Sequence, residues 1–230
     1  MARVRKKRRW KFKLFVFILF VAAIFFSAMY ITYNYIFPLK YENKILQYSR
    51  EYDLDTYLIM GIISTESGFN ENAKSHKDAK GLMQIKEDTA EWVVKKFEMD
   101  VSNDEIYEPH TNIKIGCRYL SYLMDIFYEK EKTAIAAYNA GQGNVGQWLK
   151  NPDYSDDGIT LKKIPFTETS DYVERVLDRK EIYSVLYDGA PSAKNFTNFI
   201  VKYAHRAGEL KPLAKDVINR IKSEISSKTE

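Results

Sequence analysis

The first pattern along the chain is a long apolar run near its N-terminus. Residues 14–33 are almost entirely apolar, and no charged residue stands between Lys13 and Lys40. About 20 apolar residues are enough to cross a bilayer as an α-helix. The pattern therefore predicts one membrane-spanning helix over residues 14–37.

The residues that flank this run indicate its orientation. Residues 1–13 contain eight lysines and arginines and no acidic residue, and such a cluster keeps its end of a membrane helix in the cytoplasm. A cleaved signal peptide is the alternative, and Ser27-Ala28 leaves cleavage open. A signal peptide, however, has an apolar core of about 7–15 residues that ends in small residues. This run is longer and ends in aromatic residues, so we favour an uncleaved anchor behind a basic cytoplasmic tail, residues 1–13.

The rest of the chain has helical periodicity. Apolar residues recur at spacings of three and four, and no segment shows convincing strand alternation. The helices that this spacing predicts cover residues 54–66, 88–97, 109–128, 132–139, 144–150 and 168–187. We therefore expect a mostly α domain over residues 41–187. Two further helices, near 193–206 and 212–226, form an extension over residues 188–230 to which the pattern assigns no role.

Glu66 ends the apolar face of the helix that begins near residue 54. It follows Ile59, Ile62 and Ile63 at helical spacing, so we expect its carboxyl group to lie against apolar side chains. Burial disfavours the charged form of a carboxyl group and raises its pKa. A carboxyl group that stays protonated near neutral pH can donate a proton to a glycosidic oxygen. Glu66 is therefore the candidate general acid.

The charge distribution argues against nucleic-acid binding. The chain has a net charge of +4, but without the eight cations of residues 1–13 it has 27 lysines and arginines against 31 acidic residues. The part beyond the tail is thus slightly acidic, and the 45% hydrophobic content of the whole chain is that of a globular protein. Both this negative net charge and the apolar membrane segment argue against a nucleic-acid-binding protein.

Cysteine and metal chemistry find little support in the sequence. Cys117 is the only cysteine and shares a helical face with Ile113 and Leu120, which favours a place in the core over a role as nucleophile. Residues 153–158 begin like a calcium loop, but Ile164 stands where such a loop carries its glutamate. With only three histidines, we expect no metal site and no cofactor.

Several short motifs follow Glu66 in a fixed order. They are Glu66-Ser67 with Phe69, Asn70 and Ser75; Gly81-Leu82-Met83-Gln84; Asn112-x3-Gly116-x2-Tyr119-Leu120; Ala137-Tyr138-Asn139-Ala140-Gly141 with Val145 and Trp148; and Ile164-Pro165-Phe166-x-Glu168-Thr169-x2-Tyr172-Val173. Together they resemble the catalytic domain of the soluble-type (SLT) lytic transglycosylases, relatives of goose-type lysozyme. The resemblance covers roughly residues 45–187, and it implies a lysozyme-like fold with Glu66 at the base of a cleft.

The resemblance also implies a reaction on peptidoglycan. Most glycosidases use two carboxylates, whereas in this family one glutamate serves twice. Glu66 would protonate the glycosidic oxygen between N-acetylmuramic acid and N-acetylglucosamine while the substrate's N-acetyl group stabilises the cation. It would then take the proton of the C6 hydroxyl, which closes a 1,6-anhydro ring. The substrate-binding residues implied are Ser75 and Tyr138 for the N-acetyl group, Gln84 and Asn139 lining the cleft, Met83 as an apolar wall, Glu168 as a structural or sugar-binding acid, and Tyr172 as a cleft aromatic.

Some alternatives stay open beside these roles. Tyr138 could instead be a core residue. Trp92, Phe97 and Trp148 are expected in the core. The loop over residues 76–80 is more basic than in relatives, which often have small residues there, and we expect it to alter substrate contact without abolishing it. Its histidine, His76, is interpreted as solvated.

Three functions remain. The first is a wall-facing, membrane-anchored lytic transglycosylase, the second a muramidase that uses water as acceptor, and the third a non-catalytic peptidoglycan-binding scaffold in an envelope assembly. An intact set of Glu66, Ser75, Gln84 and Tyr138 argues against the scaffold.

Overall fold

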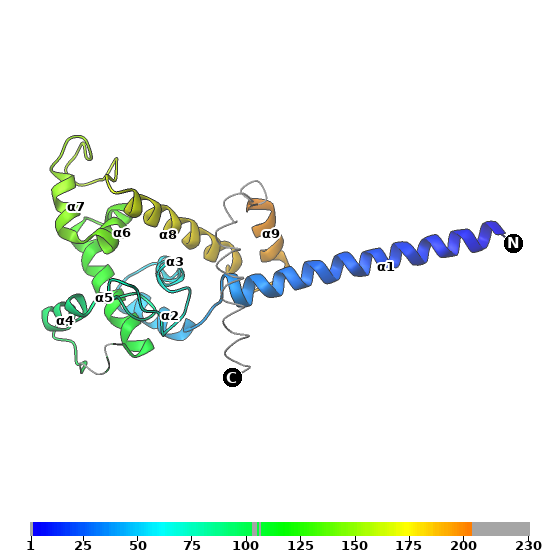
Figure 1. Cartoon of the computed structure of the whole chain (residues 1–230), viewed down its shortest axis with the longest axis horizontal. Coiled ribbons are helices and arrows are strands. Elements are labelled where there is room, and N and C mark those ends of the chain that lie inside the picture. The colour runs from blue at the N-terminus through cyan, green and yellow to red at the C-terminus, as the bar shows by residue number, and fades with distance from the viewer. Residues whose placement is uncertain (1, 103–104, 106, 204–230) are drawn as a thin grey trace. The chain divides into compact units, whose positions relative to one another are not determined.

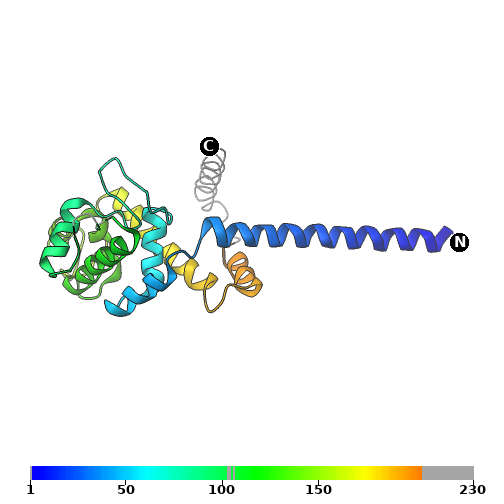
Figure 2. The same ribbon diagram turned by 90° about the horizontal axis from the view of Figure 1, so that it is seen from below.

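The computed structural model describes residues 2–102, 105 and 107–203, with side chains from residue 9 onward. It divides into two units, one formed by residues 1–39 and 189–230 and the other by Lys40–Asp188. The second helix expected near residues 212–226, and the end of the helix expected to reach residue 206, lie outside the described residues. Figures 1 and 2 show the helices of both units.

The N-terminal helix carries the apolar run. Helix α1 covers Ala2–Ile31 and continues into a π-helical turn, η1, at Thr32–Ile36. Together they include Arg9–Ile36, a segment of 28 residues whose most apolar window of 18 residues has a mean hydropathy of 2.7, so the segment is long and apolar enough to cross a membrane. Most of its large apolar side chains are exposed in the described part of the unit, as expected of a helix whose partner is lipid.

A C-terminal helix packs on the far end of α1 within the same unit. Helix α9 covers Ala193–Tyr203. The Phe196 ring lies 5.2 Å from the Phe25 ring, and the Phe199 ring lies 6.1 Å from that of Phe37. Edge-to-face aromatic pairs of this kind add to the stabilisation that burial gives. The described part of the extension expected after residue 188, up to residue 203, therefore groups with the N-terminal helix.

The second unit is built from seven helices in the described part of the chain. They are α2 (Glu42–Glu51), α3 (Thr56–Glu66), α4 (Glu87–Lys96), α5 (Pro109–Ile126), α6 (Glu131–Ala140), α7 (Gln142–Leu149) and α8 (Thr167–Leu186). Among the described residues no strand forms, and only two isolated bridges, Lys74–Lys80 and Lys80–Ile85, occur in the loop after α3. The expectation of a mostly α domain is confirmed.

Helix α3 runs through the core of this unit. Asp55 caps it, since its carboxylate accepts hydrogen bonds from the backbone N–H groups of Tyr57 at 2.7 Å and Leu58 at 3.2 Å. Gly61 lets α8 approach closely, because a Cβ atom there would lie 2.8 Å from the Val176 carbonyl oxygen. The close packing of α3 on α8 fixes the direction in which the last residue of α3 points.

The loop between α3 and α4 is tied to α5 by a buried amide. The Asn112 side chain accepts a hydrogen bond from the backbone N–H of Met83 at 2.8 Å and donates one to the carbonyl of Lys80 at 3.2 Å. Glycine is required at position 81, because its φ is +79° and a Cβ atom there would lie 2.7 Å from the Asn112 amide.

Four residues outside this loop test the prediction of the core. Cys117 and Trp148 are buried, so their expected places in the core are confirmed. Trp92 and Phe97 are only half-buried.

Candidate active site

Glu66 is the last residue of α3, and its side chain faces a cavity of about 380 Å³. Burial raises the pKa of its carboxyl group to about 7, while a hydrogen bond from Tyr172 and the charge of Arg175 act in the opposite direction. Desolvation outweighs both. The group is therefore poised to give up or take a proton near neutral pH.

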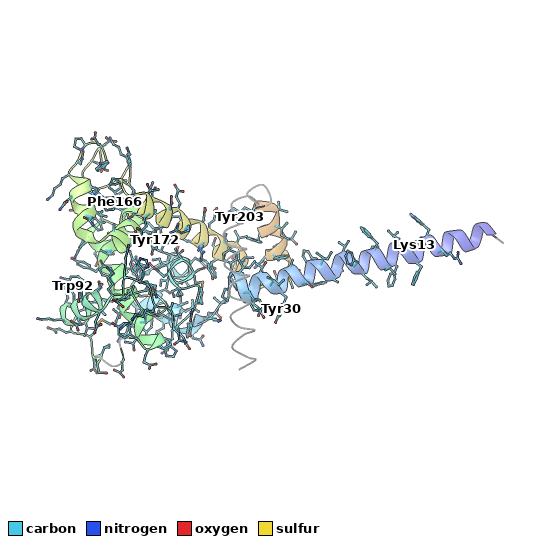
Figure 3. All side chains as sticks on the ribbon, in the orientation of Figure 1. Lys13, Tyr30, Trp92, Phe166, Tyr172 and Tyr203 are labelled. Carbon is cyan, nitrogen blue, oxygen red and sulfur yellow. The ribbon has the colours of Figure 1, made fainter. Side chains whose placement is uncertain are left out.

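Tyr172 lies on α8 (Figure 3) and contacts Glu66. Its phenolic hydroxyl donates a hydrogen bond to Oε1 of Glu66 at 2.6 Å. Burial and the nearby Glu66 charge raise the pKa of Tyr172 well above its usual value. The hydroxyl thus stays protonated and acts as a fixed donor that orients the carboxyl group.

Tyr138 lies on α6 and borders the same cavity. Its hydroxyl donates a hydrogen bond to the Met83 carbonyl at 2.9 Å, and its ring packs at 5.5 Å from that of Tyr119. Burial and the charge of Glu66 raise the pKa of Tyr138 well above the usual value. Tyr138 therefore joins α6 to the loop after α3 and presents a neutral hydroxyl group beside the acid.

Hydrogen bonds within the loop hold its cavity-lining residues. The Ser75 hydroxyl oxygen accepts from the backbone N–H groups of Lys77 at 3.2 Å and Ala79 at 3.1 Å. The Gln84 amide donates to the carbonyls of Ala73 at 3.0 Å and Gly81 at 2.9 Å. These bonds fix the loop backbone, so the wall it forms is largely preorganised for a ligand.

The cavity brings together residues from four separate segments. Its lining includes Glu66, Ser75, Gln84, Tyr138, Asn139 and Glu168. These come from the end of α3, the loop after it, the end of α6 and the first turn of α8. An acid of raised pKa in a polar cavity of this kind is a typical site for general acid–base chemistry.

Comparison with known proteins identifies the family. The transglycosylase SLT domain matches residues 43–159. The chain belongs to this family.

Relatives of the SLT domain share sequence and fold with the chain. It is 40% identical over 144 residues to the soluble lytic murein transglycosylase of Salmonella typhimurium, an alignment that covers 61% of this chain and 22% of that protein. It is 32% identical over 173 residues to membrane-bound lytic murein transglycosylase C of Glaesserella parasuis, covering 71% of this chain and 43% of that protein. The chain thus matches less than half the length of each of these relatives.

A solved structure extends the likeness to three dimensions. The lytic transglycosylase Slt of Pseudomonas aeruginosa, solved as an inactive mutant in which one glutamate is replaced by glutamine, is 34% identical and superimposes with a TM-score of 0.60. The match covers 69% of this chain and 26% of that one. The expected lysozyme-like SLT fold is thereby confirmed, preceded by one apolar helix.

Among the SLT-motif residues, two lie elsewhere than expected. The Met83 side chain is fully buried, and its sulfur occupies the space where Gly116 lacks a Cβ atom. It belongs to the core and does not line the cavity, so the expectation of an apolar cleft wall is wrong, and its carbonyl accepts the hydrogen bond of the Tyr138 hydroxyl. Tyr172 is also buried and acts through Glu66, not as an exposed cleft aromatic.

Other lining residues carried no assigned role in the sequence. Tyr119 was part of a motif, but its place on the cavity wall was not foreseen, and Lys86 and Thr89 belong to no motif. Their position depends on how the loop turns back toward α4, which periodicity does not predict. His76 and Lys77 of the basic loop also line the cavity.

Metal ligands do not gather in the described part of the chain. No group of three or more histidine, cysteine or acidic side chains there could hold a metal ion. Glu168 instead pairs with Lys77, whose Nζ atom lies 3.4 Å from its Oε1 atom.

Proposed function

We propose that the chain is a membrane-anchored peptidoglycan lytic transglycosylase that cleaves the β-1,4 bond between N-acetylmuramic acid and N-acetylglucosamine. The observation that carries the proposal is the carboxyl group of Glu66, whose pKa of about 7 and place on the cavity wall suit a general acid. Membership of the SLT family supplies the substrate class, since its relatives are named as murein transglycosylases.

In the first step, protonated Glu66 donates its proton to the glycosidic oxygen. The bond to the muramic C1 breaks, and the N-acetyl oxygen of the same sugar stabilises the cationic centre, as in substrate-assisted glycosidases. Ser75 and Tyr138 border the cavity and are proposed to orient that N-acetyl group. Gln84 and Asn139 would contact the sugars on either side.

In the second step, the Glu66 carboxylate accepts the proton of the muramic C6 hydroxyl. The C6 oxygen then closes the 1,6-anhydro ring, and Glu66 returns to its protonated form without consuming water. Glu168 is the one other acid that borders the cavity among the described residues, and it is paired with Lys77. This arrangement favours a mechanism in which one carboxyl group acts as acid and then as base.

The anchor would place this chemistry next to the cell wall. The span Arg9–Ile36 follows a basic tail, which favours a cytoplasmic N-terminus and a catalytic unit on the outer side of the cytoplasmic membrane. The similarity to membrane-bound lytic murein transglycosylase C agrees with an attachment to the membrane.

The test is digestion of purified peptidoglycan by the full-length chain in detergent, with the products read by mass spectrometry. We expect 1,6-anhydromuramic ends from the wild type. The Glu66→Gln variant should lose at least about 10²-fold in rate, the lower end of what a general acid contributes. Reducing ends would instead establish a muramidase. A folded wild-type chain that binds peptidoglycan and releases no product would indicate the scaffold function.

A further inference from the structure

The basic side chains that line the cavity all belong to one segment of the chain. His76, Lys77 and Lys86 all lie in the segment between α3 and the start of α4, and residues 138–141 and Glu168 line the same cavity. All three are exposed. This segment therefore presents two lysine ammonium groups, those of Lys77 and Lys86, to whatever enters the cavity.

Lys77 makes an ion pair at the cavity mouth. Its Nζ atom lies 3.4 Å from Oε1 of Glu168, so the pair links the loop after α3 to the first turn of α8. The two side chains are 57% and 74% exposed. An ion pair this exposed is weak and screened by salt, so Lys77 can exchange Glu168 for another carboxylate at little cost.

The loop leaves the charge of Lys77 available for such an exchange. The neighbouring carboxylate of Asp78 pairs with Lys74 at 3.1 Å. The backbone N–H of Lys77 donates to the Ser75 hydroxyl at 3.2 Å. The backbone is thus fixed next to a lining residue, while the ammonium group is directed across the cavity mouth toward α8.

We propose that Lys77 is the cation of a carboxylate subsite at the cavity mouth, and that Glu168 occupies it when no substrate is bound. The ligand is a carboxylate on the muramic side of a glycan strand. Its source is either the stem peptide or, where the peptide is missing, the free lactyl group of the sugar. Binding replaces the Lys77–Glu168 pair with a charge-assisted hydrogen bond to the substrate, and Lys86 adds a second positive charge from the same segment.

This subsite rests on the proposed function, because it assumes that a glycan strand fills the cavity. It makes the chain selective for strands that carry free carboxylates. Glu168 acts as a competing internal ligand, so its removal strengthens carboxylate binding. The two residues of one ion pair are therefore expected to have opposite effects.

Binding can be measured apart from catalysis in the full-length Glu66→Gln background. The probes are peptide-bearing strands, strands stripped of peptide, and each of these with its carboxylates converted to amides. The quantity is the ratio of affinities for the charged and the amidated form of the same strand. A preference confined to peptide-bearing strands identifies the stem peptide as the ligand, and one that persists in stripped strands identifies the lactyl group.

Lys77→Met is expected to lower this ratio about three- to fivefold, the upper part of the range for an exposed ion pair. Glu168→Gln is expected to raise it about twofold. Lys132→Met, which removes an exposed lysine of α6 that does not line the cavity, should leave the ratio unchanged. Added salt should weaken the preference in the parent chain and have little effect on it in Lys77→Met.

An unchanged ratio in Lys77→Met overturns the subsite, and so does an equal loss of affinity for charged and amidated strands. A charge preference that depends on Lys77, in a chain whose wild type cleaves no strand, supports the subsite and refutes the proposed enzyme. A chain that binds no strand at all refutes both.

Discussion

The Tyr172 hydroxyl donates a 2.6 Å hydrogen bond to Oε1 of Glu66 and joins two residues that lie 106 positions apart. This hydrogen bond and the burial of the Glu66 carboxyl group have opposite effects on the pKa of Glu66. Burial raises the pKa because the charged form loses water, and the hydrogen bond lowers it because the charged form accepts more strongly. The resulting value of about 7 is the balance between the two.

Removal of this hydroxyl should shift the pH dependence of activity. In Tyr172→Phe the carboxylate of Glu66 loses a donor, so its pKa should rise further. A hydrogen bond to a charged group contributes about 1.5 kcal/mol, which corresponds to about one pH unit. The alkaline limb of kcat/KM should therefore move upward by up to about one unit, as a pH–rate profile would reveal.

Tyr57→Phe is the matched control for that shift. The Tyr57 hydroxyl also bridges α3 to the region of α8, where it donates to the carbonyl of Tyr187 at 3.1 Å. It does not contact Glu66, so its removal should lower stability by about 1 kcal/mol without moving the pH profile. Equal shifts in both variants would refute a specific role of Tyr172 in setting the pKa.

The stability of the protein should also depend on Glu66 in a pH-dependent way. Between about pH 4.5 and 7 the carboxyl group is protonated in the folded state and ionised in the unfolded state, so ionisation favours unfolding as the pH rises. Glu66→Gln removes this effect. The variant should match the wild type at pH 4 and exceed it by up to about 3 kcal/mol at pH 8.

Denaturant unfolding of both full-length proteins at pH 4 and pH 8 measures that difference. The comparison of the same two proteins at two pH values serves as its own control, because a packing effect of the substitution would be present at both. A stability difference between the two proteins that is the same at pH 4 and at pH 8 would contradict a raised pKa at Glu66.

Periodicity predicts the helices of this chain well because most of them bury one continuous apolar face. The helix through Ile59, Ile62 and Glu66 is found as α3, and the expected ends of the others differ from the structure by a few residues. The same pattern predicts the burial of Glu66, because this residue lies on the apolar face of α3. The order of the motifs indicated the family because each motif sits on a different segment of one cavity.

The side-chain directions in the loop could not be read from the sequence in this way. Met83 stands in a motif beside Gln84, yet one points into the core and the other borders the cavity. That choice depends on the space left by Gly116, 33 positions further on, and on the amide of Asn112. The pairing of Lys77 with Glu168 likewise arises only once α8 packs on α3.

The fit between Gly116 and Met83 gives a prediction of its own. A Cβ atom at Gly116 would lie 2.4 Å from the Met83 sulfur, so Gly116→Ala must displace the buried side chain. We expect a loss of about 1–3 kcal/mol in unfolding free energy. Activity should fall as well at temperatures where the variant is folded, because the Met83 carbonyl holds the Tyr138 hydroxyl.

Gly146→Ala provides the comparison. Gly146 lies inside α7 with open space where a Cβ atom would be. Alanine there should leave stability unchanged or raise it by up to about 1 kcal/mol, because alanine favours a helix more than glycine does. Thermal unfolding and peptidoglycan digestion of the two variants separate overpacking at Gly116 from a general effect of glycine replacement. Full stability and activity in Gly116→Ala would refute the tight contact.

The proposed orientation in the membrane can be tested with single cysteines, because the natural Cys117 is fully buried and should not react in the folded protein. In a Cys117→Ser background, Lys150→Cys should react with a membrane-impermeant maleimide in intact cells, since residue 150 is exposed in the unit that carries Glu66. Ala2→Cys should react only after the membrane is opened, because the basic tail favours the cytoplasm. Labelling at residue 2 in intact cells would reverse the orientation and move the catalytic unit away from the wall. Labelling at both positions in a soluble fraction would show that the apolar helix does not anchor the chain.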